Sequence, residues 1–541
     1  MAHSASDTET FDYVVVGAGS AGAVIAARLT EDSRTRVLLL EAGGPADADE
    51  ITVPAAFANL FRTKWDWGYR TTEQKQLEGR RADWPRMKAL GGCSSMNAMI
   101  YIRGNHADFD TWRDAYGATG WGHDDVLPYF KRAEGNTRLG APLHGQDGPL
   151  HVEDRRYTHP MTNLWVESAV AAGLKRNDDF NGREQEGAGL YQVTCKKGRR
   201  WSTAKAYLEP AESRPNLTIR TGAHAHRVLI EDGRAVGVLY EVDGRLRTAR
   251  VEAEVVLSGG AIASPQLLML SGVGPGAHLR EVGVDVLVDL PGVGQNLHDH
   301  PVVPLVFRTR GVTDLLNHNN LGQFLRAKAS GTGPLVSNIG EGGGFWRSRP
   351  DLAAPDIQAH VAPTGFYDNG LHEPTERGFT AAPTLVNVAS RGTLRLRSTD
   401  PHWHPEIDAA YYDDATDLDA MTAGVRRTLE ITFGGPIAPH IVGGLLPTMR
   451  EWRAGSDISD TAIVDHIRRH SQTLYHPVGT CAMGGDERAV VDPELKVRGV
   501  KGLRVADASV MPMVTRGNTN APSIMIGEKA ADLLRGKAAA R

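Results

Sequence analysis

The chain has few cysteines, no long apolar run and no basic cluster, and each absence excludes a class of protein. Only Cys93, Cys195 and Cys481 occur among 541 residues. This small, odd number argues against a disulfide framework and favours a reducing compartment. Apolar stretches such as Val37–Leu40 are far too short to cross a bilayer, and the polar residues 1–10 are unlike a signal peptide. We therefore expect a cytoplasmic protein; peripheral association with a membrane stays open.

Charge and length narrow the class further. The chain has 60 basic and 65 acidic residues, a net charge of −5, and no Lys/Arg-rich run, so we expect no nucleic-acid partner. Its 41% hydrophobic and 23% charged content is typical of a globular protein. A chain of 541 residues is too long for one ordinary core, which predicts at least two domains. Assembly into a homo-oligomer stays open.

The most informative motif is a glycine-rich turn near the N-terminus. Residues 11–22 read FDYVVVGAGSAG, a strand followed by Gly-x-Gly-x-x-Gly and a helix, and the next strand ends at Glu41. Gly17 allows a tight turn, Gly19 lets backbone N–H groups approach a pyrophosphate, and Gly22 lets the helix lie close to the sheet. The helix N-terminus favours phosphate. We expect one bound dinucleotide, with its ribose donating hydrogen bonds to Glu41.

The rest of the pattern predicts an α/β chain whose domains are interleaved. Strands predominate after residue 217, with hairpin turns at Asp232-Gly233 and Asp243-Gly244. A mixed region follows, and the last strand and helix return to the first sheet. The expected strands are 217–220, 227–230, 235–240, 252–257, 357–363, 393–396 and 503–507; the expected helices are 161–173, 417–432 and 524–534.

Four further segments lie in the order of the signatures of one enzyme family. They are LGGCSSMN at 90–97, GAIASPQLLMLSGVG at 260–274, GVGQNLHDH at 292–300, and a tail with YHPVGT at 475–480 and NTN at 518–520. With the N-terminal turn they resemble the glucose–methanol–choline (GMC) family of FAD-dependent oxidoreductases, specifically its choline-dehydrogenase-like alcohol dehydrogenase and oxidase branch. The resemblance extends from residue 11 to about residue 535.

The resemblance implies an α/β architecture (α+β overall). A Rossmann-like FAD-binding domain would be interleaved with a substrate domain made of an antiparallel sheet and helices. We expect the FAD-binding domain to comprise residues 11–155, 206–300 and 471–541, the last part with the catalytic loops. The substrate domain would comprise residues 156–205 and 301–470.

The implied cofactor is FAD. Gly91 and Gly92 can bring backbone N–H groups against a flat polar ring, and Asn97 would lie near the flavin's reactive centre. Met96 stands where some relatives carry a histidine linked covalently to the flavin, so we expect non-covalent FAD. Asp507 could face the cofactor or cap a helix. The other expected FAD-binding residues are Ser20, Ala21, Ala42, Trp67, Ser94, Val228, Gly260, Ala508, Asn518 and Thr519, besides Gly17, Gly19, Gly22 and Glu41.

His476 and Asn520 resemble the family's catalytic His–Asn pair. Alcohol oxidation needs a group that takes the hydroxyl proton while hydride leaves the carbon for flavin N5, and an imidazole suits that work. Asn520 could orient the alcohol oxygen without adding charge. The expected reaction converts a primary alcohol to its aldehyde, with dioxygen or another electron acceptor completing the cycle.

Glu341 and Tyr475 are the expected substrate contacts. Glu341 falls near the position where choline oxidases place a carboxylate that faces the trimethylammonium group, and Tyr475 or Trp67 could offer an aromatic face to a cation. Met96 and Ala98 depart from the choline oxidase pattern. We therefore favour a neutral primary alcohol, aliphatic or aromatic, and leave choline open.

Other chemistries have weaker support. The pairs His298/His300 and His402/His404 have i, i+2 spacing, but no further Cys/His cluster completes a tetrahedral site in the sequence. We therefore expect no metal. No Gly-x-Ser-x-Gly elbow supports a serine hydrolase. A lyase or another non-redox flavoprotein on the same scaffold stays open, because one fold can carry several chemistries.

Overall fold

The N-terminal motif forms the predicted strand–helix–strand unit. The structure, a computed structural model, describes residues 8–318, 320–371 and 376–536. β1 (Thr8–Val16) and β2 (Val37–Leu40) pair in parallel, and α1 (Gly22–Leu29) connects them. Every residue of β2 is buried, as expected for a strand covered on both faces.

A mixed sheet grows outward from this unit. Its further strands are β10 (Leu217–Arg220), β11 (His224–Glu231), β12 (Arg234–Val242), β13 (Arg245–Leu257) and β25 (Leu503–Val505). Within the described residues the order is β10-β2-β1-β13-β12-β11, with β25 pairing β13. The pairs from β10 to β13, and β13 with β25, are parallel; β13-β12-β11 is an antiparallel meander. The Rossmann-like fold is confirmed.

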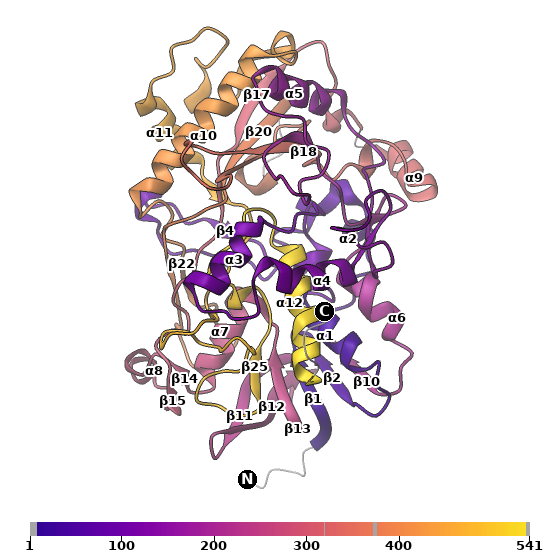
Figure 1. The fold of residues 1–541 in the computed structure, drawn as a ribbon, viewed down its shortest axis with the longest axis vertical. Helices are drawn as coiled ribbons and strands as arrows, with labels where there is room; N and C mark the ends of the chain where they lie inside the picture. The colour runs from indigo at the N-terminus through magenta and orange to yellow at the C-terminus, as the bar shows by residue number, and fades with distance from the viewer. Residues whose placement is uncertain (1–7, 319, 372–375, 537–541) are drawn as a thin grey trace.

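A second, antiparallel sheet lies at the opposite end of the molecule (Figure 1). In the described chain its main order is β23 (Ile441–Gly444), β17 (Leu305–Thr309), β20 (Gly378–Leu385), β19 (Ile357–Ala362), β18 (Gly342–Trp346) and β7 (Gly187–Leu190). β16 (Pro301–Val302) pairs with β20 and with β24 (Gln472–Thr473). Helices α5 (Pro160–Ala171) and α10 (Ala415–Gly434) pack on this sheet, so the predicted antiparallel sheet with helices is confirmed.

The two sheets take their strands alternately from the chain. The first uses segments near residues 8–40, 217–257 and 503–505, and the second uses segments near 187–190, 301–385, 441–444 and 472–473. This arrangement agrees with interleaved domains, whose bounds stay a prediction. Among the described residues, no helix combines the length and apolarity that crossing a membrane requires.

Several element starts differ from the sequence prediction, and two of them matter for function. α12 (Asn520–Leu534) begins four residues before the expected position 524, because Pro522 lies in its first turn, where a missing N–H costs no helical hydrogen bond. β11 begins at His224 instead of residue 227, with a bulge in its pairing to β12 between Ala225 and Arg227.

Candidate active site

A long cavity opens at the carboxyl ends of β1, β2 and β13 and extends to the second sheet. Open α/β sheets bind ligands at this edge. The sequence-predicted residues that line the cavity are Gly17, Gly19, Ser20, Ala21, Glu41, Ala42, Trp67, Gly92, Asn97, Gly260, Tyr475, His476, Asp507, Ala508, Asn518, Thr519 and Asn520. Five other predicted residues do not line it: Gly22, Gly91, Ser94, Val228 and Glu341.

The glycine turn has the space that a dinucleotide needs. Gly17 has φ +98°, and a Cβ there would lie 2.6 Å from the Ser258 carbonyl oxygen. A Cβ on Gly22 would lie 2.0 Å from the Gly17 carbonyl oxygen. Gly22 therefore lets α1 pack closely against the turn, behind the cavity wall. At Gly19 the nearest atom to a Cβ is 3.8 Å away. The backbone is therefore open to a ligand at Gly19, as the motif predicts.

Glu41 supports the same turn from the end of β2. Its carboxylate accepts hydrogen bonds from the backbone N–H groups of Ala18 (3.0 Å) and Gly43 (2.8 Å). Burial raises the pKa of Glu41 to about 7, against these two hydrogen bonds that lower it. Glu41 lines the cavity, which fits a carboxylate facing the hydroxyl groups of a ribose.

The second glycine loop packs directly on the first. The Gly91 N–H donates to the Ala18 carbonyl (2.8 Å), and a Cβ on Gly92 would lie 2.7 Å from the Gly19 Cα. The Ser94 hydroxyl donates to the Gly91 carbonyl (2.6 Å). Gly91 and Ser94 therefore shape the loop from behind, while Gly92 and Asn97 line the cavity.

Asp507 lies in the cavity wall and also caps a short helical turn, Ala508–Val510. It lines the cavity at the end of β25, and its carboxylate accepts hydrogen bonds from the Gly260 N–H (2.8 Å), the Ser264 hydroxyl (2.6 Å) and the Ser509 N–H (2.8 Å). These bonds fix the start of α7 (Gly260–Leu270) against the cavity. Burial is the main influence on its pKa, which is raised.

His476 lies in the cavity wall with both ring nitrogens close to polar groups. Its Nδ1 is 2.9 Å from the His300 Nδ1, and its Nε2 is 3.4 Å from the Asn518 Nδ2. Its backbone N–H donates to the Asp299 carboxylate (2.7 Å). Burial, followed by the neighbouring His300, holds the pKa of His476 well below its usual range. The imidazole is therefore neutral at neutral pH.

The structure does not bring the predicted pair His476 and Asn520 together. Asn520 is the first residue of α12, and its Nδ2 donates to the Ser20 hydroxyl (2.8 Å) in the glycine turn. Asn518, two residues earlier in the extended loop, faces His476 instead. Because α12 starts at Asn520, these two asparagines point to different parts of the cavity.

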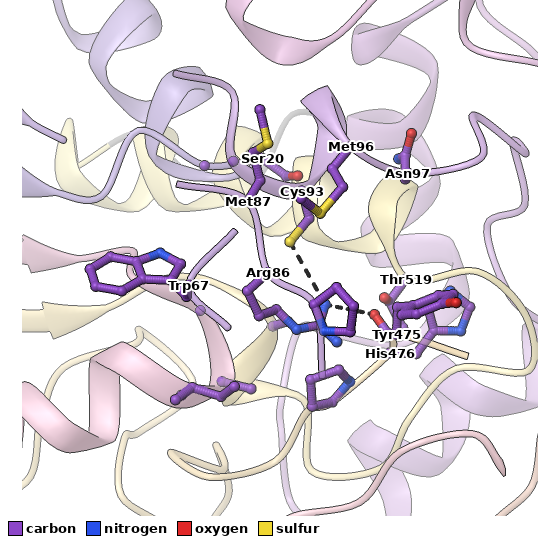
Figure 2. Close-up of a pocket in the computed structure, with 18 of the residues that line it drawn as sticks. Ser20, Trp67, Arg86, Met87, Cys93, Met96, Asn97, Tyr475, His476 and Thr519 are labelled. Atoms are coloured by element: carbon purple, nitrogen blue, oxygen red, sulfur yellow. Dashed lines mark hydrogen bonds between the residues drawn. The ribbon is translucent and has the colours of Figure 1, made fainter. Parts of the chain in front are cut away.

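Arg86 was missed by the sequence analysis. Figure 2 shows its side chain between Trp67 on one side and Tyr475 and His476 on the other. Its Nη1 donates to the Tyr475 carbonyl (2.8 Å), whereas Nε and Nη2 are buried with no hydrogen-bond partner in the described structure. A guanidinium with free donors in a cavity wall fits an oxygen-rich ligand. The WPRMK segment that carries Arg86 lacks a spacing pattern that would have marked it.

An apolar pocket adjoins His476. Its buried core includes Phe57, Phe61 and Met96, and Phe366 and Tyr475 pack against it. The Phe61 and Tyr475 ring centroids are 5.5 Å apart, and those of Phe57 and Phe366 are 6.0 Å apart. All five residues line the cavity, so the wall around His476 is well suited to apolar groups.

Glu341 and Val228 lie elsewhere than predicted. The Glu341 carboxylate is fully buried and accepts hydrogen bonds from the Ser337 hydroxyl (2.6 Å), the Thr162 hydroxyl (2.6 Å) and the His159 N–H (2.8 Å). It therefore joins its own segment to the start of α5, and it does not line the cavity. Val228 is buried in β11, where its N–H donates to the Ser271 hydroxyl (2.9 Å). From this strand region, residues 223–225 line the cavity instead.

The fold and cavity together define a class of protein. A glycine turn at the edge of a parallel sheet, an acid at the end of β2 and an open Gly19 fit a bound dinucleotide. A neutral histidine and an apolar pocket lie farther along the same cavity. The arrangement is that of a dinucleotide-dependent oxidoreductase with a small-molecule substrate.

Comparison with known proteins gives the family. The GMC oxidoreductase models match residues 11–302 and 388–527. An uncharacterized GMC-type oxidoreductase of Mycobacterium tuberculosis is 46% identical, covering 98% of this chain and 100% of the relative. An oxygen-dependent choline dehydrogenase of Paraburkholderia phymatum is 43% identical, covering 98% of this chain and 93% of the relative. The alcohol dehydrogenase [acceptor] of Pseudomonas putida is 42% identical, covering 97% of this chain and 95% of the relative.

A solved structure agrees with these relatives. Pyridoxine 4-oxidase from Mesorbium loti superimposes with a TM-score of 0.88 at 31% identity, covering 98% of this chain and 100% of that one. The chain belongs to the GMC oxidoreductase family. It is an FAD-dependent oxidoreductase that acts on CH–OH groups of small-molecule alcohols and passes electrons to an acceptor, and its FAD is bound non-covalently.

Proposed function

We propose that this enzyme oxidises a neutral primary alcohol to the aldehyde, with His476 taking the hydroxyl proton and Asn518 holding the hydroxyl oxygen. The observation that carries the proposal is the 3.4 Å approach of His476 Nε2 and Asn518 Nδ2 in the cavity wall. This pair lies beside the apolar pocket, where the alcohol would bind.

We assign one tautomer to His476. With the Asn518 Nδ2 as the donor, His476 Nε2 is the acceptor in this contact. The ring proton is then on Nδ1, which lies 2.9 Å from the His300 Nδ1. A neutral imidazole with its lone pair on Nε2, facing the cavity, is the form that a general base requires.

In the proposed reaction the alcohol loses one proton and one hydride. The O–H bond of the alcohol breaks and its proton moves to His476 Nε2, while the hydride leaves the same carbon and the C–O bond becomes a carbonyl. FAD, when bound, supplies the acceptor for that hydride. The Asn518 amide donates to the developing alkoxide oxygen, and because the amide is uncharged it does not repel the proton that His476 takes up.

The charges in the cavity favour a neutral substrate over choline. Among the described residues that line it, Glu41 and Asp507 are the acidic ones, and both are engaged with backbone groups near the cofactor turn. The cationic Arg86 lies near His476, with its Nη1 bound to the Tyr475 carbonyl. A quaternary ammonium group would be desolvated in the apolar pocket without a carboxylate partner, which is costly.

An anaerobic panel of alcohols tests the proposal. We expect aliphatic or aromatic primary alcohols to bleach the visible absorbance of the bound FAD, and choline to do so much more slowly. Rapid bleaching by choline alone would overturn the neutral-substrate assignment in favour of choline oxidation. Unchanged absorbance with cleavage of a cyanohydrin would instead identify a lyase. Repeating the active cases in air separates an oxidase from a dehydrogenase.

The pH dependence of kcat/KM tests the role of His476. Protonation removes the Nε2 lone pair, so activity is lost as the pH falls through the pKa of His476. Since burial holds that pKa well below the usual value of about 6.5, we expect a flat profile through neutral pH and an acidic limb well below 6.5. Flavin absorbance at each pH checks that the protein stays folded; an acidic limb above 6.5 in folded enzyme contradicts the assignment.

A further inference from the structure

Three histidines gather at the cavity end that lies away from His476. His224 and His226 belong to β11, and His402 belongs to the loop between β21 (Thr393–Arg395) and β22 (Glu406–Asp408). One ring nitrogen from each lies within 4.8 Å of the others. His224 itself lines the cavity, and its ring centroid is 5.7 Å from that of Trp67.

The fold explains why these side chains converge. Residues 224 and 226 share one face of β11 because side chains alternate along a strand. The bulge between Ala225 and Arg227 lies at His226, and bulges redirect side chains. The loop that carries His402 is fixed from the other side, since the Gln266 Nε2 donates to the Trp403 carbonyl (2.9 Å).

A fourth donor lies beside two of the three histidines. Glu241 lies on β12 directly opposite His224. Its Oε2 is 3.4 Å from the His226 Nε2 and 3.3 Å from the His402 Nε2. A tetrahedral zinc ion with bonds of about 2.0–2.1 Å places neighbouring ligand atoms roughly 3.4 Å apart. These two separations therefore already match the edges of a zinc coordination tetrahedron.

His226 has a ring nitrogen available to a metal ion. The His226 Nε2 is buried and makes no hydrogen bond in the described structure. Its 3.4 Å approach to the Glu241 carboxylate is an ion-pair distance without hydrogen-bond geometry, and a metal ion bound by both atoms would satisfy them.

We propose that His224, His226, His402 and Glu241 form a binding site for one divalent transition-metal ion of the zinc type. Three imidazoles and one carboxylate are typical zinc ligands, whereas Mg²⁺ and Ca²⁺ prefer sites made of oxygen ligands. The ion would join the β11–β12 hairpin to the loop of His402, and so fasten one wall of the cofactor cavity. The site has four protein ligands and is structural, because the reacting end of the cavity lies at His476.

Metal binding by the untagged, FAD-loaded enzyme tests this site. After removal of metals with a chelating resin, the enzyme is titrated with ZnCl₂ by calorimetry, and the bound metal is counted by mass spectrometry after gel filtration. We expect one Zn²⁺ per chain and no comparable binding of Mg²⁺. His226→Ala and His402→Ala should each weaken Zn²⁺ binding by at least about 10–100-fold, the loss seen when even the outer support of a metal site is removed.

His404→Ala is the matched control. This histidine belongs to the same loop, but its ring lies against Tyr69, with centroids 4.7 Å apart, so its removal should leave Zn²⁺ binding unchanged. The visible spectrum of bound FAD and the circular dichroism melting curve verify that each variant is folded. Absence of stoichiometric Zn²⁺ binding to the parent enzyme overturns the proposal. So does binding that persists in both His226→Ala and His402→Ala, or that depends equally on His404.

Discussion

Replacement of His476 by alanine is expected to lower kcat by about 10²–10⁴, the usual contribution of a positioned acid–base group, while FAD stays bound. The variant loses the Nε2 lone pair but keeps the glycine turn, Glu41 and Asp507. Anaerobic stopped-flow bleaching of the flavin by the best alcohol measures the chemical step. The ratio of visible to protein absorbance in the purified variant measures the FAD content.

A surface histidine provides the control for this measurement. His440 approaches the Arg310 carbonyl (3.3 Å) and does not line the cavity, so His440→Ala should bleach at the parent rate. Bleaching at the parent rate by His476→Ala would contradict the proposed base. Loss of bleaching together with loss of FAD would show that His476 mainly supports the cofactor site.

The glycine turn could be predicted from the sequence because its determinants are local. Gly17 needs a positive φ, and Gly22 has no room for a Cβ beside the Gly17 carbonyl. Both requirements arise within a dozen residues, in a strand–turn–helix unit whose apolar and small residues reveal it. The parallel pairing of β1 with β2 follows from the same unit.

The arrangement around His476 could not be predicted in the same way. His300 contacts His476 through ring nitrogens that are 176 positions apart in the sequence, and spacing alone gave the His298/His300 pair no role. Val228 lies farther along β11 than residues 223–225, which line the cavity at the start of the strand. Side-chain direction at such positions depends on long-range packing.

Glu341 illustrates a different kind of error. Analogy with choline oxidases predicts that Glu341 contacts the substrate. Its carboxylate instead accepts three internal hydrogen bonds and is fully buried. Two of the three donors, Thr162 and His159, come from a segment far away in the sequence. A sequence gives the residue type at such a position, but the donors that surround it are assembled only by the fold.

Alanine at position 518 and alanine at position 520 should have different effects: Asn518→Ala should lower turnover, and Asn520→Ala should lower the affinity for FAD. Asn518→Ala removes the donor beside His476 Nε2 and should lower kcat by about 10²–10³, the range for loss of one donor to a developing oxyanion. Asn520→Ala removes the hydrogen bond to Ser20 in the glycine turn (2.8 Å). A typical net contribution of about 0.5–1.5 kcal/mol then corresponds to FAD affinity reduced by up to roughly tenfold, with kcat at saturating FAD within a few-fold of the parent.

The two variants control for each other, because they make the same chemical change at positions two residues apart. Steady-state turnover at saturating FAD gives kcat, and quenching of free flavin fluorescence gives the FAD affinity. The opposite result, with turnover lost in Asn520→Ala and kept in Asn518→Ala, would restore the pairing that the sequence predicts. It would then require Asn520 to leave Ser20 when the alcohol binds, since in the present arrangement the start of α12 directs its amide toward the cofactor turn.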